Sequence, residues 1–213
     1  IITLENDGDI TSTDFLIERT RLFGYGGDGT WNLQDDGAQV SDGGHGAGTL
    51  GGTSIIYDAN GTKIGERGGT GAANAQTWIL EGDFYAYNLT LDNANGPVNL
   101  DTGGYRLFVF GTLTIESGCK IVNNGTDGSN GAADTGGEGA AASGEGTLKG
   151  TTAGGDGGNG GSGVGSGASP GGGGGGAGSS GGIIFISART IVNSGTIEAK
   201  GGNGGEGADG GLY

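Results

Sequence analysis

The sequence contains no methionine, one cysteine, one histidine and two prolines among its 213 residues. A single cysteine, Cys119, cannot form an internal disulfide framework, which excludes the small disulfide-stapled secreted folds. We expect Cys119 to be a small buried residue beside Ile121. Collagen is excluded as well, because it needs proline at about 15–20% or more. The chain starts at Ile1 without an initiator methionine, so we expect a processed chain or a fragment of a longer one.

Basic residues are also scarce, since 9 Lys and Arg face 24 Asp and Glu, for a net charge of −15. A surface of this sign repels phosphates, so we expect no nucleic-acid partner. No apolar run approaches the roughly 18 residues that a membrane span needs, and the longest candidate is 183–186. We therefore expect no membrane insertion.

The sequence offers little catalytic chemistry. His45 stands in a glycine-rich stretch with nothing nearby that marks a catalytic triad or a metal site, and a nucleophilic pair with Cys119 has no support from the spacing. The neighbouring acids Asp35 and Asp36 have the composition of a glycosidase pair but are typical of solvated turns. We expect no enzymatic activity.

We expect no cofactor either. Calcium is the most plausible ion, because acidic turns offer oxygen ligands. However, the run 201–206 carries Glu206 where the calcium-binding nonapeptide has aspartate.

The abundant residue is glycine, with 58 positions. An ordered glycine has no side chain whose burial could offset the lost backbone entropy, so backbone hydrogen bonds and close packing must do so. The alternative is a flexible linker.

Alternation of apolar and polar residues predicts β-strands through the first half of the chain. The run 54–64 contains Asn60-Gly61, which predicts a hairpin with a type I′ turn. The run 77–87 is divided by Glu81-Gly82-Asp83, which predicts a second hairpin. Residues 107–110 and 183–186 do not alternate and are expected to be covered on both faces. Helix and strand both remain open for 15–23.

The glycine tracts have a period of three. Glycines recur at this spacing in three runs: Gly125, Gly128 and Gly131; Gly154, Gly157, Gly160 and Gly163; Gly201, Gly204, Gly207 and Gly210. This period fits packed polyglycine-II-like helices, in which inward positions lack side chains so that neighbouring backbones can hydrogen-bond. Residues between these glycines are expected to point outward into solvent: Asp156, Asn159, Ser162, Asn203, Glu206 and Asp209.

These patterns predict an all-β chain, with an antiparallel or solenoid-like strand region followed by polyglycine-II-like packed helices. We place a β-strand-rich domain at 1–120 and the glycine-rich region at 121–213, with a strand pair near 183–199. A weak repeat relates 120–126 to 190–196, as the rungs of a solenoid would.

The runs 89–91, 105–113 and 182–191, together with the triplet glycines between them, resemble glycine-rich repeats of bacterial surface proteins and phage tail fibres. The resemblance covers roughly residues 77–213. It implies an exposed fibrous assembly and transfers no individual functional residue.

We therefore expect a structural subunit of a homopolymeric extracellular filament, located outside the cell or on its surface. A terminal strand at residues 1–4 could add to a neighbour's sheet. The assembly contacts are expected at these residues: Ile1, Ile2, Leu4, Gly154, Gly157, Gly160, Gly201, Gly204 and Gly207. The alternative is a receptor-binding tip or shaft of a phage tail fibre, part of a virion, with a cell-surface glycan or receptor as partner.

Overall fold

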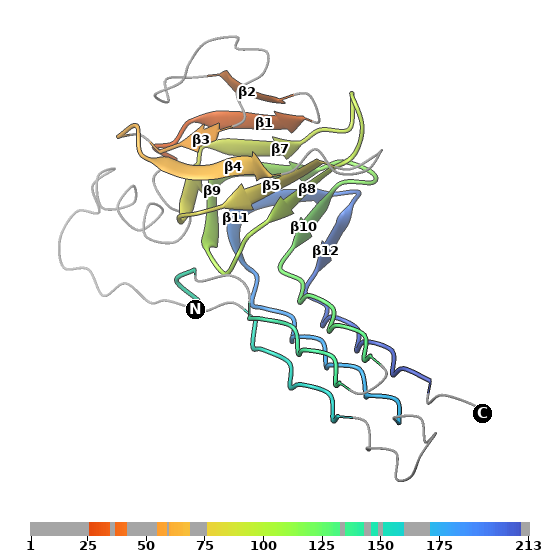
Figure 1. The fold of residues 1–213 in the computed structure, drawn as a ribbon. Coiled ribbons are helices and arrows are strands. Elements are labelled where there is room, and N and C mark those ends of the chain that lie inside the picture. The colour runs from red at the N-terminus through yellow and green to blue at the C-terminus, as the bar shows by residue number, and fades with distance from the viewer. Residues whose placement is uncertain are drawn as a thin grey trace, which may run out of the picture.

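The computed structural model describes residues 26–34, 37–41, 55–58, 60–68, 76–132, 135–142, 146–148, 151–159 and 171–209. The expected terminal strand at residues 1–4, the segment 15–23 and His45 lie outside these ranges. The described residues form two β-sheets and a set of extended glycine-rich segments that project from one side of the sheets (Figure 1).

The two sheets are named A and B here. Sheet A has the strand order β11-β9-β7-β1-β2, with β6 paired to β9, and sheet B has the order β12-β10-β8-β5-β4-β3. The strands of sheet A are β1 (Thr30–Gln34), β2 (Gly37–Ser41), β6 (Phe84–Ala86), β7 (Asn88–Leu91), β9 (Arg106–Ile115) and β11 (Phe185–Asn193). Those of sheet B are β3 (Ile55–Tyr57), β4 (Lys63–Gly68), β5 (Gln76–Leu80), β8 (Val98–Asp101), β10 (Lys120–Val122) and β12 (Thr196–Glu198).

The chain winds alternately through the two sheets, which makes most of the pairing parallel. It runs through β7 and β8, then β9 and β10, then β11 and β12, with one strand of each couple in each sheet. Strands of successive couples pair in parallel, β7 with β9 and β9 with β11 in sheet A, and β8 with β10 and β10 with β12 in sheet B. Each couple is one rung of a stack, and β11 with β12 forms the last rung.

The hydrophobic core lies between the two sheets and is built from columns of inward side chains. In sheet B, Trp78, Leu100 and Ile121 occupy matching positions on successive strands and are fully buried. Cys119 belongs to the same core, as expected from the sequence, and burial raises the pKa of its thiol. The period-two alternation of the strands thus produces a stack of inward residues from rung to rung.

One expected hairpin is confirmed and the other is wrong. β3 and β4 pair antiparallel, which confirms the hairpin, but Gly61 N–H donates to Asp58 O, so Asn60-Gly61 is not the central pair of the turn and the expected type I′ turn is wrong. Residues 81–83 instead form a corner between the sheets, because β5 pairs with β8 in sheet B whereas β6 pairs with β9 in sheet A. Trp78 and Phe84 both point into the same core. The alternation of apolar and polar residues in the sequence is therefore the same for a corner between two sheets as for a hairpin within one sheet.

Five glycine-rich segments are described, called a to e in chain order: a (123–132), b (135–142), c (151–159), d (171–184) and e (199–209). Their backbone hydrogen bonds join different segments at three-residue intervals. Segment d contacts all four others, through bonds such as Gly176 N–H to Ser129 O (a), Gly137 N–H (b) to Gly174 O, Ala177 N–H to Gly155 O (c) and Gly205 N–H (e) to Gly176 O.

The expected fold is corrected by this arrangement. Within the described ranges there is no helix, and the sheets mix parallel and antiparallel pairs, so the expected antiparallel or solenoid-like strands followed by polyglycine-II-like helices are wrong. The described glycine segments contain no helix and are extended chains whose backbone hydrogen bonds go to neighbouring segments. The period of three therefore reports which residues face a neighbouring backbone. Only the all-β class agrees with the structure.

The glycine segments continue the strand pairing of sheet B. β10 leads into segment a and β12 leads into segment e, and Lys120 pairs with Thr196 in the strands. Farther along, Asn124 Oδ1 accepts a hydrogen bond from Lys200 N, 76 residues ahead, which is the same offset. The last rung and segment e therefore form one continuous edge.

A second junction ties the glycine segments to the sheets through residues 146–148. Gly146 N–H and Leu148 N–H donate to the carbonyls of Gly103 and Gly104. The Thr147 hydroxyl donates to Asp83 Oδ1, and the guanidinium of Arg106 donates to Asp83 Oδ2. Burial opposes ionisation of Asp83, but the hydrogen bonds from Arg106 and Thr147 outweigh it and lower the pKa of this carboxyl.

We predict that Asp83→Asn lowers thermal stability in a pH-dependent way. A carboxylate whose pKa is depressed by folding contributes stability above the unfolded value of about 4, and this contribution is lost as the pH falls through the folded value. The difference in melting temperature between wild type and variant should be largest above about pH 5 and shrink below about pH 4. Thermal scans across this window test it, and a difference that does not change with pH would contradict it.

We also predict that two isoleucines of one column differ in their contribution to stability. Ile121→Ala should lower the free energy of unfolding by about 3 kcal/mol, because it leaves a cavity in the core. Ile197→Ala, at the matching position on β12 but 40% exposed, should cost about 1 kcal/mol or less in a dilute sample. Urea unfolding measures both, and equal losses would show that the last rung is covered in solution.

Candidate functional site

Both sheets end on the same rung, the last one, formed by β11 and β12. β11 is the terminal strand of sheet A and β12 that of sheet B. Within the described part of the chain, each pairs on one side only, β11 with β9 and β12 with β10. Strand edges of this kind present free backbone N–H and C=O groups that can pair with another chain.

The core is also uncovered at this rung. In sheet A, Trp31, Leu89 and Leu113 are buried, but Ile191, the next residue of the same column, is 48% exposed. In sheet B, Ile197 follows the fully buried Ile121 and is 40% exposed. The inward face that earlier rungs cover is therefore open to solvent at the end of the stack.

A row of aromatic rings on the outer face of sheet A reaches the same end. Tyr85 and Phe108 stack with their centroids 4.9 Å apart, and Phe108 contacts Phe185 at 5.5 Å. Phe185 lies on β11 and is 41% exposed. The expectation that residues 183–186 are covered on both faces is wrong, because Ile183 is 56% and Phe185 41% exposed, and only residues 185–186 belong to a strand.

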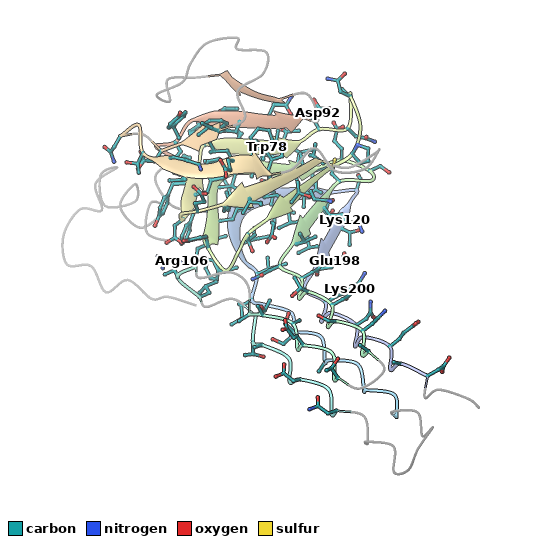
Figure 2. The ribbon with its side chains drawn as sticks, in the orientation of Figure 1. Trp78, Asp92, Arg106, Lys120, Glu198 and Lys200 are labelled. Atoms are coloured by element: carbon teal, nitrogen blue, oxygen red, sulfur yellow. The ribbon has the colours of Figure 1, made fainter. Side chains whose placement is uncertain are left out.

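Charged side chains gather where the last rung passes into segment e. Figure 2 labels Lys120, Glu198 and Lys200 at this place. Glu198 pairs with Lys200 at 2.7 Å and with Lys120 at 3.5 Å. The Lys200 ammonium, with smaller help from Asn124 and Lys120, holds the pKa of Glu198 below its ordinary value. These ion pairs lie where β12 passes into segment e.

The glycine segments pack so closely that many positions accept no side chain. A Cβ on Gly125, Gly128 or Gly131 would overlap backbone carbonyls of segment d. Gly154 and Gly157 face segment d in the same way. Glycine is required at these positions because two backbones meet there.

The other glycines that the sequence singled out are placed differently. At Gly201, Gly204 and Gly207 a Cβ would have ordinary contact distances of 3.4–3.6 Å to segment d. The close contacts of segment e belong to Gly202 and Gly205, one residue later. Ile1, Ile2, Leu4 and Gly160 lie outside the described residues.

Sequence reasoning missed a set of asparagine and aspartate side chains that accept backbone hydrogen bonds. Asn124, Asp127 and Asn130 of segment a accept from the N–H groups of Lys200, Asn203 and Glu206. Asp156 and Asn159 of segment c are exposed, as expected, and they also accept from the N–H groups of Gly139 and Gly136, which was not expected. The recurrence of Asn or Asp immediately before a triplet glycine is the signal that could have identified them.

No group of three or more His, Cys, Asp or Glu side chains that could hold a metal ion occurs among the described residues. In the same part of the chain, no helix is long and apolar enough to cross a membrane. The surface that stands out is therefore the open end rung together with segment e.

We predict opposite effects for alanine at two glycines of the segments. Gly128→Ala should push segment d away and break several intersegment hydrogen bonds, at about 1 kcal/mol each, so it should strongly lower the melting temperature. Gly158→Ala should leave the melting temperature unchanged or raise it slightly, because no atom lies within 4 Å of the added Cβ. Thermal unfolding of the two variants decides, and equal tolerance would mean that the segments do not pack as described.

No protein-family model, no curated protein and no solved structure matches this chain. No relative therefore supports or contradicts the resemblance to glycine-rich surface and tail-fibre proteins. Function is inferred from the geometry of the open rung and segment e.

Proposed function

We propose that this protein is a structural subunit of a homopolymeric extracellular filament in which copies stack end to end. The observation that carries the proposal is the uncovered last rung, where Ile191 and Ile197 continue buried columns yet are 48% and 40% exposed. A further rung placed on β11 and β12 would bury both side chains and pair both strand edges.

Stacking of this kind produces a filament because the two ends of each subunit differ. The sheets end on β11 and β12 at one end and on β2 and β3 at the other. A contact that joins one end to the opposite end of the next copy is heterologous, and such contacts continue indefinitely unless the rotation closes a ring. The aromatic row that ends at Phe185 adds a further apolar surface to the same interface.

The proposal needs no catalytic step. Among the described carboxyl groups with lowered pKa values, Asp83 and Glu198 are engaged in ion pairs, and Asp58 accepts backbone hydrogen bonds in the turn between β3 and β4. An extracellular location agrees with a chain that has one cysteine, buried in the core, and no need for a reducing environment.

We predict that Ile191→Lys prevents assembly and leaves the subunit folded. The side chain is half exposed, so a lysine can reach solvent in the free subunit, but it would be buried without a partner between two copies. Ile79→Lys is the matched control, because Ile79 is 38% exposed on β5, a strand paired on both sides.

Electron microscopy should show filaments for wild type and Ile79→Lys and none for Ile191→Lys at the same concentration. Thermal unfolding should be similar for the three proteins in dilute solution. A wild-type protein that remains a monodisperse monomer in light scattering at high concentration would refute the proposed function.

A further inference from the structure

Segment a binds segment e through a repeated pair of residues, an asparagine or aspartate followed by glycine. Gly125 N–H donates to Lys200 O at 2.8 Å, and Asn124 Oδ1 accepts from Lys200 N at 2.7 Å. The pair thus satisfies both backbone groups of one residue on the neighbouring segment. The same arrangement repeats three and six residues later, where Asp127-Gly128 binds Asn203 and Asn130-Gly131 binds Glu206.

Segment c uses such a pair against segment b, although these two run antiparallel. Gly157 N–H donates to Gly137 O, and Asp156 Oδ1 accepts from Gly139 N at 2.8 Å. An Asx-Gly pair therefore acts as a combined acceptor and donor toward a neighbouring backbone in two separate places.

Segment e carries this pattern at Asn203-Gly204 and a variant of it at Glu206-Gly207, where glutamate stands in place of asparagine or aspartate, and neither pair has a neighbouring segment among the described residues. Asn203-Gly204 and Glu206-Gly207 repeat at three-residue spacing, and all four residues are exposed. Within the described ranges, the N–H groups of Gly204 and Gly207 donate no hydrogen bond and the side chains of Asn203 and Glu206 engage no partner. The acceptors and donors of this edge are therefore unpaired within the part of the chain that the structure describes.

No contact with the described residues requires glycine at positions 204 and 207 of this edge. A Cβ on Gly204 would lie 3.6 Å from the nearest atom, Gly176 O, and one on Gly207 would lie 3.4 Å from Gly173 O. Alanine would fit both positions, in contrast to Gly202 and Gly205, where a Cβ would overlap backbone of segment a. Glycine at 204 and 207 is explained if another backbone approaches there.

We propose that segment e is a docking edge for an extended glycine segment of a second copy of this chain, held by Asn203-Gly204 and Glu206-Gly207. The partner is taken as a second copy because segment e continues β12, so its free side is the continuation of the rung edge in the proposed filament. In this respect the inference rests on the proposed function.

Segment c offers the matching surface on the second copy. It runs in the same direction as segment e, since both lie antiparallel to segment d. Gly155 and Gly158 have no atom within 4 Å of an added Cβ, and their N–H groups donate no bond within the described residues. In the two intrachain cases an Asx-Gly pair likewise binds backbone N–H and C=O groups of a neighbouring segment, and in segment b the residues bound are glycines, Gly137 and Gly139.

The test compares two double variants of segment e. Asn203→Ala with Glu206→Ala removes both acceptors, whereas Asn203→Asp with Glu206→Gln keeps an acceptor oxygen at each position and leaves the net charge unchanged. Glu138→Ala, an exposed acid of segment b, controls for the charge lost in the alanine variant. The readouts are the critical concentration for assembly, from sedimentation, and the melting temperature of the dissociated subunit.

The alanine variant should raise the critical concentration about tenfold or more, and the acceptor-retaining variant and Glu138→Ala should assemble like wild type. Gly204→Ala should also impair assembly, and none of these changes should shift the melting temperature. Filaments of unchanged critical concentration in the alanine variant would overturn the docking edge and leave the proposed function standing. A wild type that forms only dimers, which the alanine variant loses, would support the edge and refute the filament. A wild type that stays monomeric at all concentrations would refute both.

Discussion

The structure depends on the close approach of one backbone to another. In the sheets this contact is the ordinary strand ladder, and the core columns of Trp78, Leu100 and Ile121 add apolar burial to it. In segments a to e the intersegment hydrogen bonds, made by the backbone and by asparagine and aspartate side chains, must offset the entropy lost by glycine. A Cβ at Gly128 or Gly157 would separate the backbones, which explains why glycine cannot be replaced there.

The sheets and the glycine segments are consequently parts of one continuous hydrogen-bonded array. β10 pairs with β12, and segment a then pairs with segment e, with the same separation of 76 residues along the sequence. Segment d leads into β11. In the sequence, segments a to d therefore lie between the rung of β9 and β10 and the rung of β11 and β12. The last rung therefore follows segments a to d along the chain. Its open edge, which extends along segment e, is the natural place for the array to continue into another copy.

The sequence allowed some of this to be predicted. Asn60-Gly61 identified a hairpin because its chemistry is local, and the buried position of Cys119 followed from its residue type. The partner of a strand is not local, so the corner at residues 81–83 could not be told from a hairpin. The contact face of segment e was ambiguous for a specific reason. Glycine pairs such as 201–202 and 204–205 fit two phases of the period of three, and Gly202 and Gly205 are the ones in close contact.

The acidic composition also has a structural reason, which the count of charges alone did not reveal. A carboxylate oxygen that accepts a backbone N–H forms a charge-assisted bond, as Asp127 and Asp156 do. A ladder of carboxylates alone would suffer repulsion between like charges. Asparagine supplies the same acceptor without charge, and in segment a Asp127 stands between Asn124 and Asn130. Although the chain has a net charge of −15, the row of side-chain acceptors in segment a alternates amides with a carboxylate, which limits the repulsion between like charges.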